Sequence, residues 1–351
     1  MNSLGGFRWL LIGMVCVACT TDPPFQIAEL LENEQSIAGK TEYLGSPYLT
    51  AGNRVYMVGH QDGSFPSLGW HIKGEMGGIW NHPIKLMDGF DITLGWGDDL
   101  YHLNRAARFV NYPFANTHTF MVKERGVAIE RTQFVPDDLE GLSVQLTLTN
   151  TLNEAQQFDL AFTGHADLRA TWLGERTKMI NGQDEPTYTK DFGGFLFKDG
   201  NNNWFSCFAA DEKPQNDIVS SVEEKQLTAS GTLSYHIDLP AKGNKTITFA
   251  IAGSYISKEE AISTLKTIQS KLPKLVEAKQ QRYRQLASQT KLTIPDKKME
   301  QTFEWLKYNC DWLVRTVPEI GTGITAGIPD YPWWFGVDSE YALQGYMAIG
   351  Q

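Results

Sequence analysis

Cysteine pairs, basic clusters and metal-binding histidine motifs are all scarce in this chain of 351 residues, and each scarcity excludes a class of protein. Only four cysteines occur: Cys16 and Cys19 lie in the N-terminal apolar run, and the other two, Cys207 and Cys310, lack the C-x-x-C spacing of a zinc or redox site. The net charge is −10 without a Lys/Arg cluster, which argues against nucleic acid and against an anionic membrane surface as partners. The seven histidines are scattered and form no H-E-x-x-H motif, so no metal or other cofactor is predicted.

The longest apolar run lies at the N-terminus. Residues 9–18 (WLLIGMVCVA) follow Arg8 and are too few to span a bilayer. Val17-Ala18-Cys19 is similar to a bacterial lipobox, although Cys16 stands where leucine is more usual. We expect a signal peptide over 1–18, lipid attachment at Cys19 and a tether over 19–36; an ordinary secretory signal cut nearby is the alternative. The prediction is an exported, membrane-anchored bacterial lipoprotein, in the periplasm or on the cell surface, that meets the membrane only through its lipid.

Two further cysteines remain, Cys207 and Cys310. An oxidising compartment would allow a disulfide between them. Cys207 lies in a strand-like stretch and Cys310 in a helical one, so the pattern favours two separate buried thiols.

The range 37–256 has the pattern of antiparallel β structure. Residues 127–135 and 142–149 alternate apolar and polar side chains, and turn sequences such as Asp62-Gly63 separate such runs. Residues 233–239 and 246–252 are predicted to pair across the turn at 242–244. The whole chain is 42% hydrophobic and 12% aromatic, which is ample for a large core, and this range predicts one large β-sandwich domain.

The pattern becomes helical after this range. Ser257 and Glu260 form a capping box, and a polar helical linker is expected over 257–294, interrupted near Pro273. A second helix is expected from Pro295-Asp296, with one apolar stripe and an adjoining face on which Trp305 and Trp312 are predicted to pack in a core. The stripe consists of Met299, Phe303, Leu306, Cys310 and Leu313. A last helix is expected from about Ser339.

Residues 327–339 (GIPDYPWWFGVDS) place a carboxylate, Asp338, directly after three aromatic rings. Rings that exclude water raise the pKa of a carboxyl and favour a proton donor, whereas a helix start stabilises the anion. The alternative for Asp338 is an ordinary helix N-cap. Trp333, Trp334 and Phe335 are candidates for a wall on which sugar stacks, and simple core packing is the alternative for them. Glu340 is more typical of an acidic residue at a helix start.

This segment resembles the catalytic-acid segment of bacterial glycogen-debranching (amylo-α-1,6-glucosidase-like) glycoside hydrolases, and residues 78–89, 134–142 and 167–172 are similar to the sandwich domain of that family. The resemblance implies a sandwich followed by an (α/α)6 six-hairpin barrel that begins in 295–351. It implies Asp338 as the general acid of cleavage with inversion, on an α-glucan or related oligosaccharide or polysaccharide. Many relatives carry arginine where this chain has Val337, which leaves the linkage open.

The range 295–351 has room for about two helices, whereas twelve helices of about 12 residues need several times more. We therefore expect a C-terminally truncated chain that lacks the catalytic base and shows no hydrolase activity by itself. A glycan-binding surface lipoprotein that uses rings such as Trp80, Trp96 and Tyr101 is one alternative, and a glycoside phosphorylase is another. His82 and His118 are candidates to reach a cleft, with ordinary loop histidines as the alternative.

Overall fold

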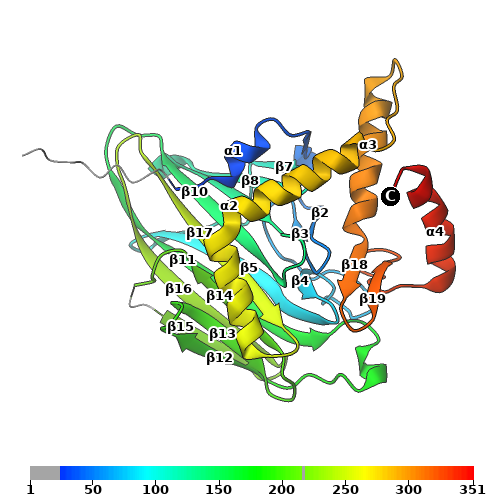
Figure 1. Ribbon diagram of the computed structural model, residues 1–351. Coiled ribbons are helices and arrows are strands. Elements are labelled where there is room, and N and C mark those ends of the chain that lie inside the picture. Colours follow the sequence, from blue (N-terminus) through cyan, green and yellow to red (C-terminus); the bar gives the residue numbers. More distant parts are fainter. Residues whose placement is uncertain (1–23, 216–217) are drawn as a thin grey trace, which may run out of the picture.

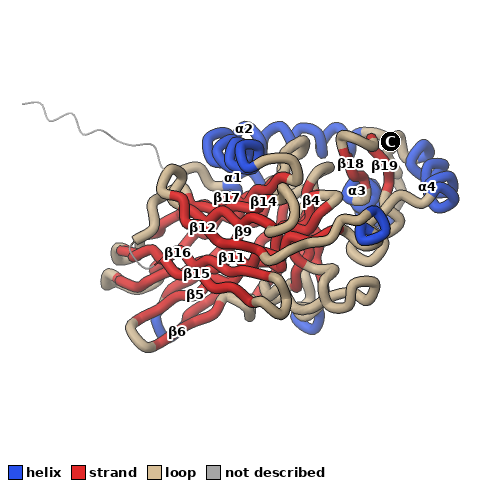
Figure 2. Tube along the Cα trace, turned by 90° about the horizontal axis from the view of Figure 1, so that it is seen from below, coloured by secondary structure: helices blue, strands red, loops and turns tan. Residues whose placement is uncertain are grey.

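The computed structural model describes residues 24–215 and 218–351, so the expected signal peptide and Cys19 lie outside the described residues. Two large antiparallel sheets face each other, and helices cover one side of them (Figures 1 and 2). The predicted β-rich fold with a large sandwich is therefore confirmed.

The first sheet contains nine strands within the described residues. Their spatial order is β1 (Ile37–Ala38), β7 (Arg108–Asn111), β8 (Ala115–Val122), β9 (Val127–Phe134), β10 (Gly141–Asn150), β17 (Asn244–Ser254), β14 (Phe205–Ala210), β13 (Gly194–Asp199) and β12 (Asp184–Thr189). Alternation of side chains in β9 and β10 sends one set inward to the core, and much of the opposite set is buried as well.

The second sheet has eight strands in the part of the chain that is described. The order is β15 (Ile218–Glu223), β16 (Thr228–Leu239), β11 (Gln156–Ala170), β5 (Ile84–Trp96), β4 (Gly78–Asn81), β3 (Val55–His60) and β2 (Pro47–Ala51), and β6 (Asp99–His102) pairs with β5. The register between β11 and β5 shifts around Ala166. Such bulges bend a strand and re-aim side chains, here those that follow Ala166 in β11.

The predicted pairing of 233–239 with 246–252 is wrong. β16 belongs to the second sheet and β17 to the first, so the turn at 242–244 crosses between the sheets. The rings of Tyr235 and Phe249 meet in the interior, with centroids 5.6 Å apart. Both strands carry an apolar inner face, and periodicity alone does not distinguish strands that pair from strands that face each other across a core.

Helix α2 (Lys258–Ser288) begins as the capping box predicts, because the Ser257 hydroxyl accepts the N–H of Glu260 at 3.2 Å. The helix does not stop at Pro273 but continues through it, changing direction in its middle (Figure 1). Its first half packs Ala261, Leu265 and Ile268 on the nine-stranded sheet, so the expected linker lies on the sandwich.

The second half of α2 meets α1 (Ile27–Leu31) and α3 (Lys297–Trp312) in a second core. Trp305 is buried there and Trp312 packs against it, which confirms their predicted core role. Arg282 fixes α3 to the sandwich, since its guanidinium donates to both carboxylate oxygens of Asp311 and to Asp137, each at 2.7 Å. Such bidentate ion pairs are geometrically specific, so α3 has a defined position relative to the sheets.

The chain then forms a hairpin, β18 (Val314–Val317) and β19 (Gly321–Ile324). Helix α4 (Gly336–Ala348) follows and stands beside α3 at one end of the sandwich (Figure 1). These last elements are helical in part, but they do not by themselves define a barrel.

Cys207 and Cys310 are both free thiols, as favoured from the sequence, but only Cys207 is buried, whereas Cys310 is partly exposed. No helix among the described residues combines the length and apolar character needed to cross a membrane.

Candidate functional site

The site expected from the sequence lies at the end of the sandwich, where residues 327–335 lead into α4. A tight turn opens this segment, because Gly327 and Tyr331 exchange backbone hydrogen bonds of 3.0 and 2.6 Å. The segment then runs past the loop after β11 before α4 begins at Gly336, three residues earlier than expected.

Asp338 lies in the first turn of α4 and is exposed. The residue at the N-cap is Phe335, so Asp338 is not the cap. A carboxylate in a first helical turn is stabilised by the helix dipole. Because Asp338 is exposed, the desolvation expected from the aromatic rings is not achieved by the described residues alone.

Asp338 borders a groove of about 590 Å³ between α3, the hairpin and α4. Most of the lining is apolar, and it includes three members of the predicted α3 stripe together with an exposed face of α4. The lining residues are Leu306, Cys310, Leu313, Ile324, Thr325, Ala326, Val337, Asp338, Ser339, Tyr341, Ala342, Gly345, Tyr346 and Ile349. Its geometry suits a ligand with apolar surface near one acidic group.

The three rings before Asp338 have different surroundings. The Trp333 indole donates to the backbone carbonyl of Trp172 at 2.6 Å, and its ring lies 5.3 Å from His82. Trp334 packs against Gly323 in β19, where a side chain larger than hydrogen would collide with the indole. Phe335 remains half-buried, with its ring 6.4 Å from that of Trp172.

Sequence reasoning missed a group of rings that joins these segments, which we call the aromatic stack: Trp70, His71, Trp172 and Tyr331. The His71 ring lies 3.7 Å from Trp70 and 3.6 Å from Trp172, and Tyr331 stands edge-on at 4.8 Å from His71. Trp172 falls within the family-like range 167–172, but nothing in the sequence shows that Trp70 reaches it. The contact depends on how two long loops fold.

Neither histidine that was a candidate for the cleft reaches one. His82 is buried, its Nε2 lies 3.2 Å from the Tyr56 hydroxyl, and burial lowers the pKa of His82 to about 3. His118 is buried between the rings of Tyr48 and Phe109, where burial holds its pKa well below the usual value. Trp80, named for a glycan-binding alternative, is fully buried beside Tyr56.

A charge cluster lies at the bulge between β11 and β5, with Lys85 and Asp167 buried and Glu75 and Asp88 partly exposed. The Lys85 ammonium donates to Asp167 at 2.8 Å, to Glu75 at 3.2 Å and to Asp88. Burial would raise the pKa of Asp167, but the charges of Lys85 and Arg169 outweigh this and lower it. The three carboxylates come within 4.8 Å of one another, as metal ligands do, but Lys85 already occupies the position of a cation.

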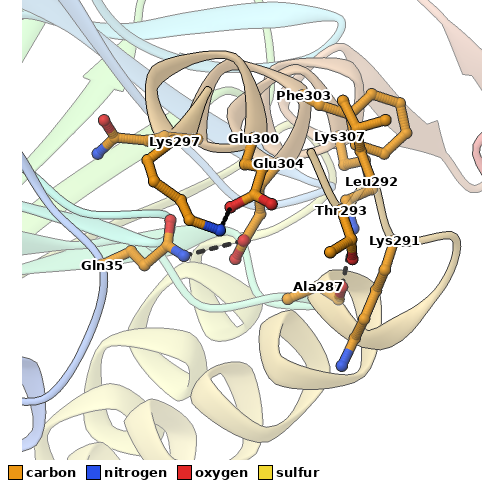
Figure 3. Close-up of a pocket in the computed structure, with 11 residues that line it drawn as sticks. Gln35, Ala287, Lys291, Leu292, Thr293, Lys297, Glu300, Phe303, Glu304 and Lys307 are labelled. Atoms are coloured by element: carbon orange, nitrogen blue, oxygen red, sulfur yellow. Dashed lines mark hydrogen bonds and ion pairs between the residues drawn. The ribbon is translucent and has the colours of Figure 1, made fainter. Parts of the chain in front are cut away.

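A second cavity, of about 530 Å³, lies on another face of α3 (Figure 3). It is lined by polar and charged side chains from the ends of α2 and α3, including Lys297 and Glu300, which pair at 2.8 Å. Lys307 donates to the carbonyls of Ala287, Gln289 and Thr290 and so closes the C-terminal end of α2. These contacts give the charged residues of this cavity structural roles, because they cap a helix or form surface ion pairs.

No protein-family model matches the sequence, and a search of curated proteins finds no match. Solved structures do resemble the fold. A protein from the human microbiome assigned as a kojibiose phosphorylase aligns with a TM-score of 0.59 at 12% identity, over 83% of this chain and 43% of that one. A bacterial glucoamylase complexed with acarbose aligns with a TM-score of 0.47 at 9% identity, over 79% and 40% of the two chains.

At such low identity the first match shows similarity of fold alone. The chain spans less than half the length of that structure.

Proposed function

We propose that this chain is the sandwich-bearing part of a glycoside hydrolase that cleaves α-glucans or related oligosaccharides. One observation carries the proposal: an exposed carboxylate, Asp338, borders an apolar groove and lies three positions after a run of aromatic residues that ends at Phe335. The similarity of fold to the structure assigned as a kojibiose phosphorylase supports it, with a TM-score of 0.59 over 83% of this chain.

In the proposed mechanism Asp338 is the general acid. It donates a proton to the glycosidic oxygen as the bond breaks, and a second carboxylate activates water on the opposite face of the sugar. Asp330 is a poor candidate for that base, because its carboxylate accepts the N–H of Trp70. Glu340 lies two positions after Asp338 on α4, hence on another side of the helix. In this proposal the base lies outside residues 24–351.

A bound sugar that covers Asp338 would supply the desolvation that the described residues lack. Trp333 and Trp334 support the segment by packing, and Phe335 is the ring of the three that lies next to the aromatic stack. In this proposal Phe335 and its neighbours, and not Trp333, therefore make the first contact with the sugar.

Export as a lipoprotein anchored through Cys19 is part of the proposal and rests on the sequence of residues 9–19. The enzyme would then act on sugars outside the cytoplasm. Radiolabelled palmitate incorporation that disappears in Cys19→Ser tests this point, and unchanged incorporation would contradict it.

A glycoside phosphorylase is the second candidate, favoured by the assignment of the matched structure. The two candidates differ in the acceptor of the glycosyl group, which is water for a hydrolase and phosphate for a phosphorylase. Release of free sugar without phosphate supports hydrolysis, whereas strict phosphate dependence with a sugar phosphate as product supports the second candidate.

The test uses the natural protein from its source cells and a panel of neutral α-linked glucans, with Asp338→Asn and Glu340→Gln as variants. Because Glu340 is exposed on the same helix, it is a matched control for a lost negative charge. We expect activity in the wild type and in Glu340→Gln and its loss in Asp338→Asn. A protein that binds these glucans but cleaves none of them would instead be the glycan-binding alternative.

A further inference from the structure

One tryptophan is mostly exposed in the described part of the chain: the side chain of Trp70 is 62% accessible. Single exposed apolar residues are common and need no explanation. Trp70 differs because it is held in place. Its backbone N–H donates to Asp330 at 3.1 Å, and its ring lies on His71. An exposed ring with a fixed orientation is a preorganised contact surface.

The aromatic stack supplies the support beneath this ring. His71 lies between Trp70 and Trp172, and Tyr331 stands edge-on to Trp70 at 6.0 Å with 41% of its side chain exposed. Three segments far apart in the sequence therefore meet here: the loop before β4, the loop after β11 and the segment before α4. Such convergence is typical of a binding site built between structural units.

The approach of the Trp70 loop to Asp330 depends on Gly69. Its φ of +86° is in the left-handed region, and a Cβ there would lie 2.9 Å from the Asp330 carboxylate and 2.3 Å from Met76. Only glycine allows the loop to come this close. The sequence thus encodes the position of Trp70 beside the segment that carries the candidate acid.

The chemistry of the surroundings restricts the ligand. Residues 327–340 contain Asp330, Asp338 and Glu340 but no Lys or Arg, so an anionic ligand would be repelled. Phe335 continues the aromatic surface from Tyr331 toward Asp338, with ring centroids 6.4 Å apart. Sugar rings offer one C–H-rich face that packs on an aromatic ring while their hydroxyls stay in water.

We propose that Trp70, from a loop of the sandwich domain, and Tyr331, from the segment that leads to Asp338, form a subsite that stacks a pyranose ring of a neutral oligosaccharide. The inference rests on the proposed function, because it takes the same glycan as ligand. It adds that the sandwich contacts the substrate directly and is more than a support for the helices.

The test measures binding of short neutral α-linked gluco-oligosaccharides to the natural protein by calorimetry, in wild type, Trp70→Ala and Tyr43→Ala. Tyr43 is a matched control, since its ring is 54% exposed and contacts the Lys40 ammonium. We expect Trp70→Ala to weaken binding about tenfold or more, as losses of central aromatic contacts do, and Tyr43→Ala to change it less than about twofold. Because Trp70 is exposed, the thermal unfolding midpoint should stay the same.

The same titration with Asp338→Asn separates this inference from the proposed function. Binding that needs Trp70 in both the wild type and Asp338→Asn supports the subsite, whatever the activity. Equal affinities of wild type and Trp70→Ala would overturn the subsite and leave a hydrolase with another substrate contact. Absence of both binding and cleavage for all these sugars would overturn the subsite and the proposed function together.

Discussion

The indole of Trp333 donates a hydrogen bond of 2.6 Å to the backbone carbonyl of Trp172, and this contact joins the segment before α4 to the loop after β11. The two residues are separated by most of the second half of the chain. Asp338 follows only five positions after Trp333, so the placement of the candidate acid depends on this contact.

Replacing Trp333 with Phe tests that link. Phenylalanine keeps a ring beside His82 but leaves the Trp172 carbonyl without its donor, which should cost about 1 kcal/mol in the free energy of unfolding. Trp334→Phe is the matched control, because the Trp334 indole nitrogen is buried with no partner among the described residues. Urea unfolding of both variants gives the difference, and equal losses would show that the hydrogen bond contributes nothing.

The charge cluster around Lys85 gives a prediction about stability and metals. Lys85→Met leaves Glu75, Asp88 and Asp167 facing one another without the buried cation and should cost about 3–5 kcal/mol. Lys245→Met removes a partly exposed pair with Glu212 and should cost less than about 1 kcal/mol. Because the carboxylates lie within 4.8 Å of one another, Ca²⁺ should raise the thermal midpoint of Lys85→Met and leave that of the wild type unchanged. A wild-type shift with Ca²⁺ would show that Lys85 does not fill the site.

Asp184 should make stability depend on pH. Burial, together with the charges of Asp167 and Asp199, raises the pKa of Asp184 to about 8 against a usual value of 3.8, although the N–H of Leu168 opposes this. The folded state therefore holds this proton more tightly, and its stabilising contribution is complete below about pH 4 and lost as the pH rises to about 8. Asp184→Asn should remove this dependence and be more stable than the wild type by about 2 kcal/mol at neutral pH.

Asp199→Asn is the matched control for Asp184→Asn. The Asp199 carboxylate accepts the N–H groups of Gly182, Asn201 and Asn202. In Asp199→Asn the NH2 group replaces one accepting oxygen and faces an N–H donor, which should destabilise the protein. Chemical unfolding between pH 4 and 8 distinguishes the two sites. If the difference in the free energy of unfolding between Asp184→Asn and the wild type did not change with pH, the raised pKa of Asp184 would be contradicted.

Local patterns predicted much of the fold. The helix start at Ser257, the helix start at Pro295-Asp296 and the core packing of Trp305 each depend on residues a few positions apart, and each is found. Of the capping box only the Ser257 half forms, because the Glu260 carboxylate accepts the hydroxyl of Ser254 instead of the Ser257 N–H. Pairing of strands was not predictable in the same way. β16 and β17 are adjacent in sequence and alternate correctly, but they lie in opposite sheets because their apolar faces meet across the core.

The candidate site, like the fold, could be predicted from the sequence only in part. The segment with Asp338 could be selected from its residues, whereas the aromatic stack could not. Trp70 and Asp330 are far apart in the sequence, and their contact is possible only because Gly69 permits the close approach. His82 looked like a loop residue beside Pro83, and its burial against Tyr56 follows from packing that no local pattern encodes.

The most direct test of the central claim is the dependence of Asp338→Asn activity on the leaving group, measured with the natural protein. An oligosaccharide leaving group must be protonated, whereas fluoride leaves a glucosyl fluoride without a proton donor. If Asp338 is the general acid, Asp338→Asn should cleave the oligosaccharide about 10²–10⁴-fold more slowly than the wild type but retain most of its rate on α-glucosyl fluoride. Equal losses on both substrates, or full activity on the oligosaccharide, would contradict the role of Asp338.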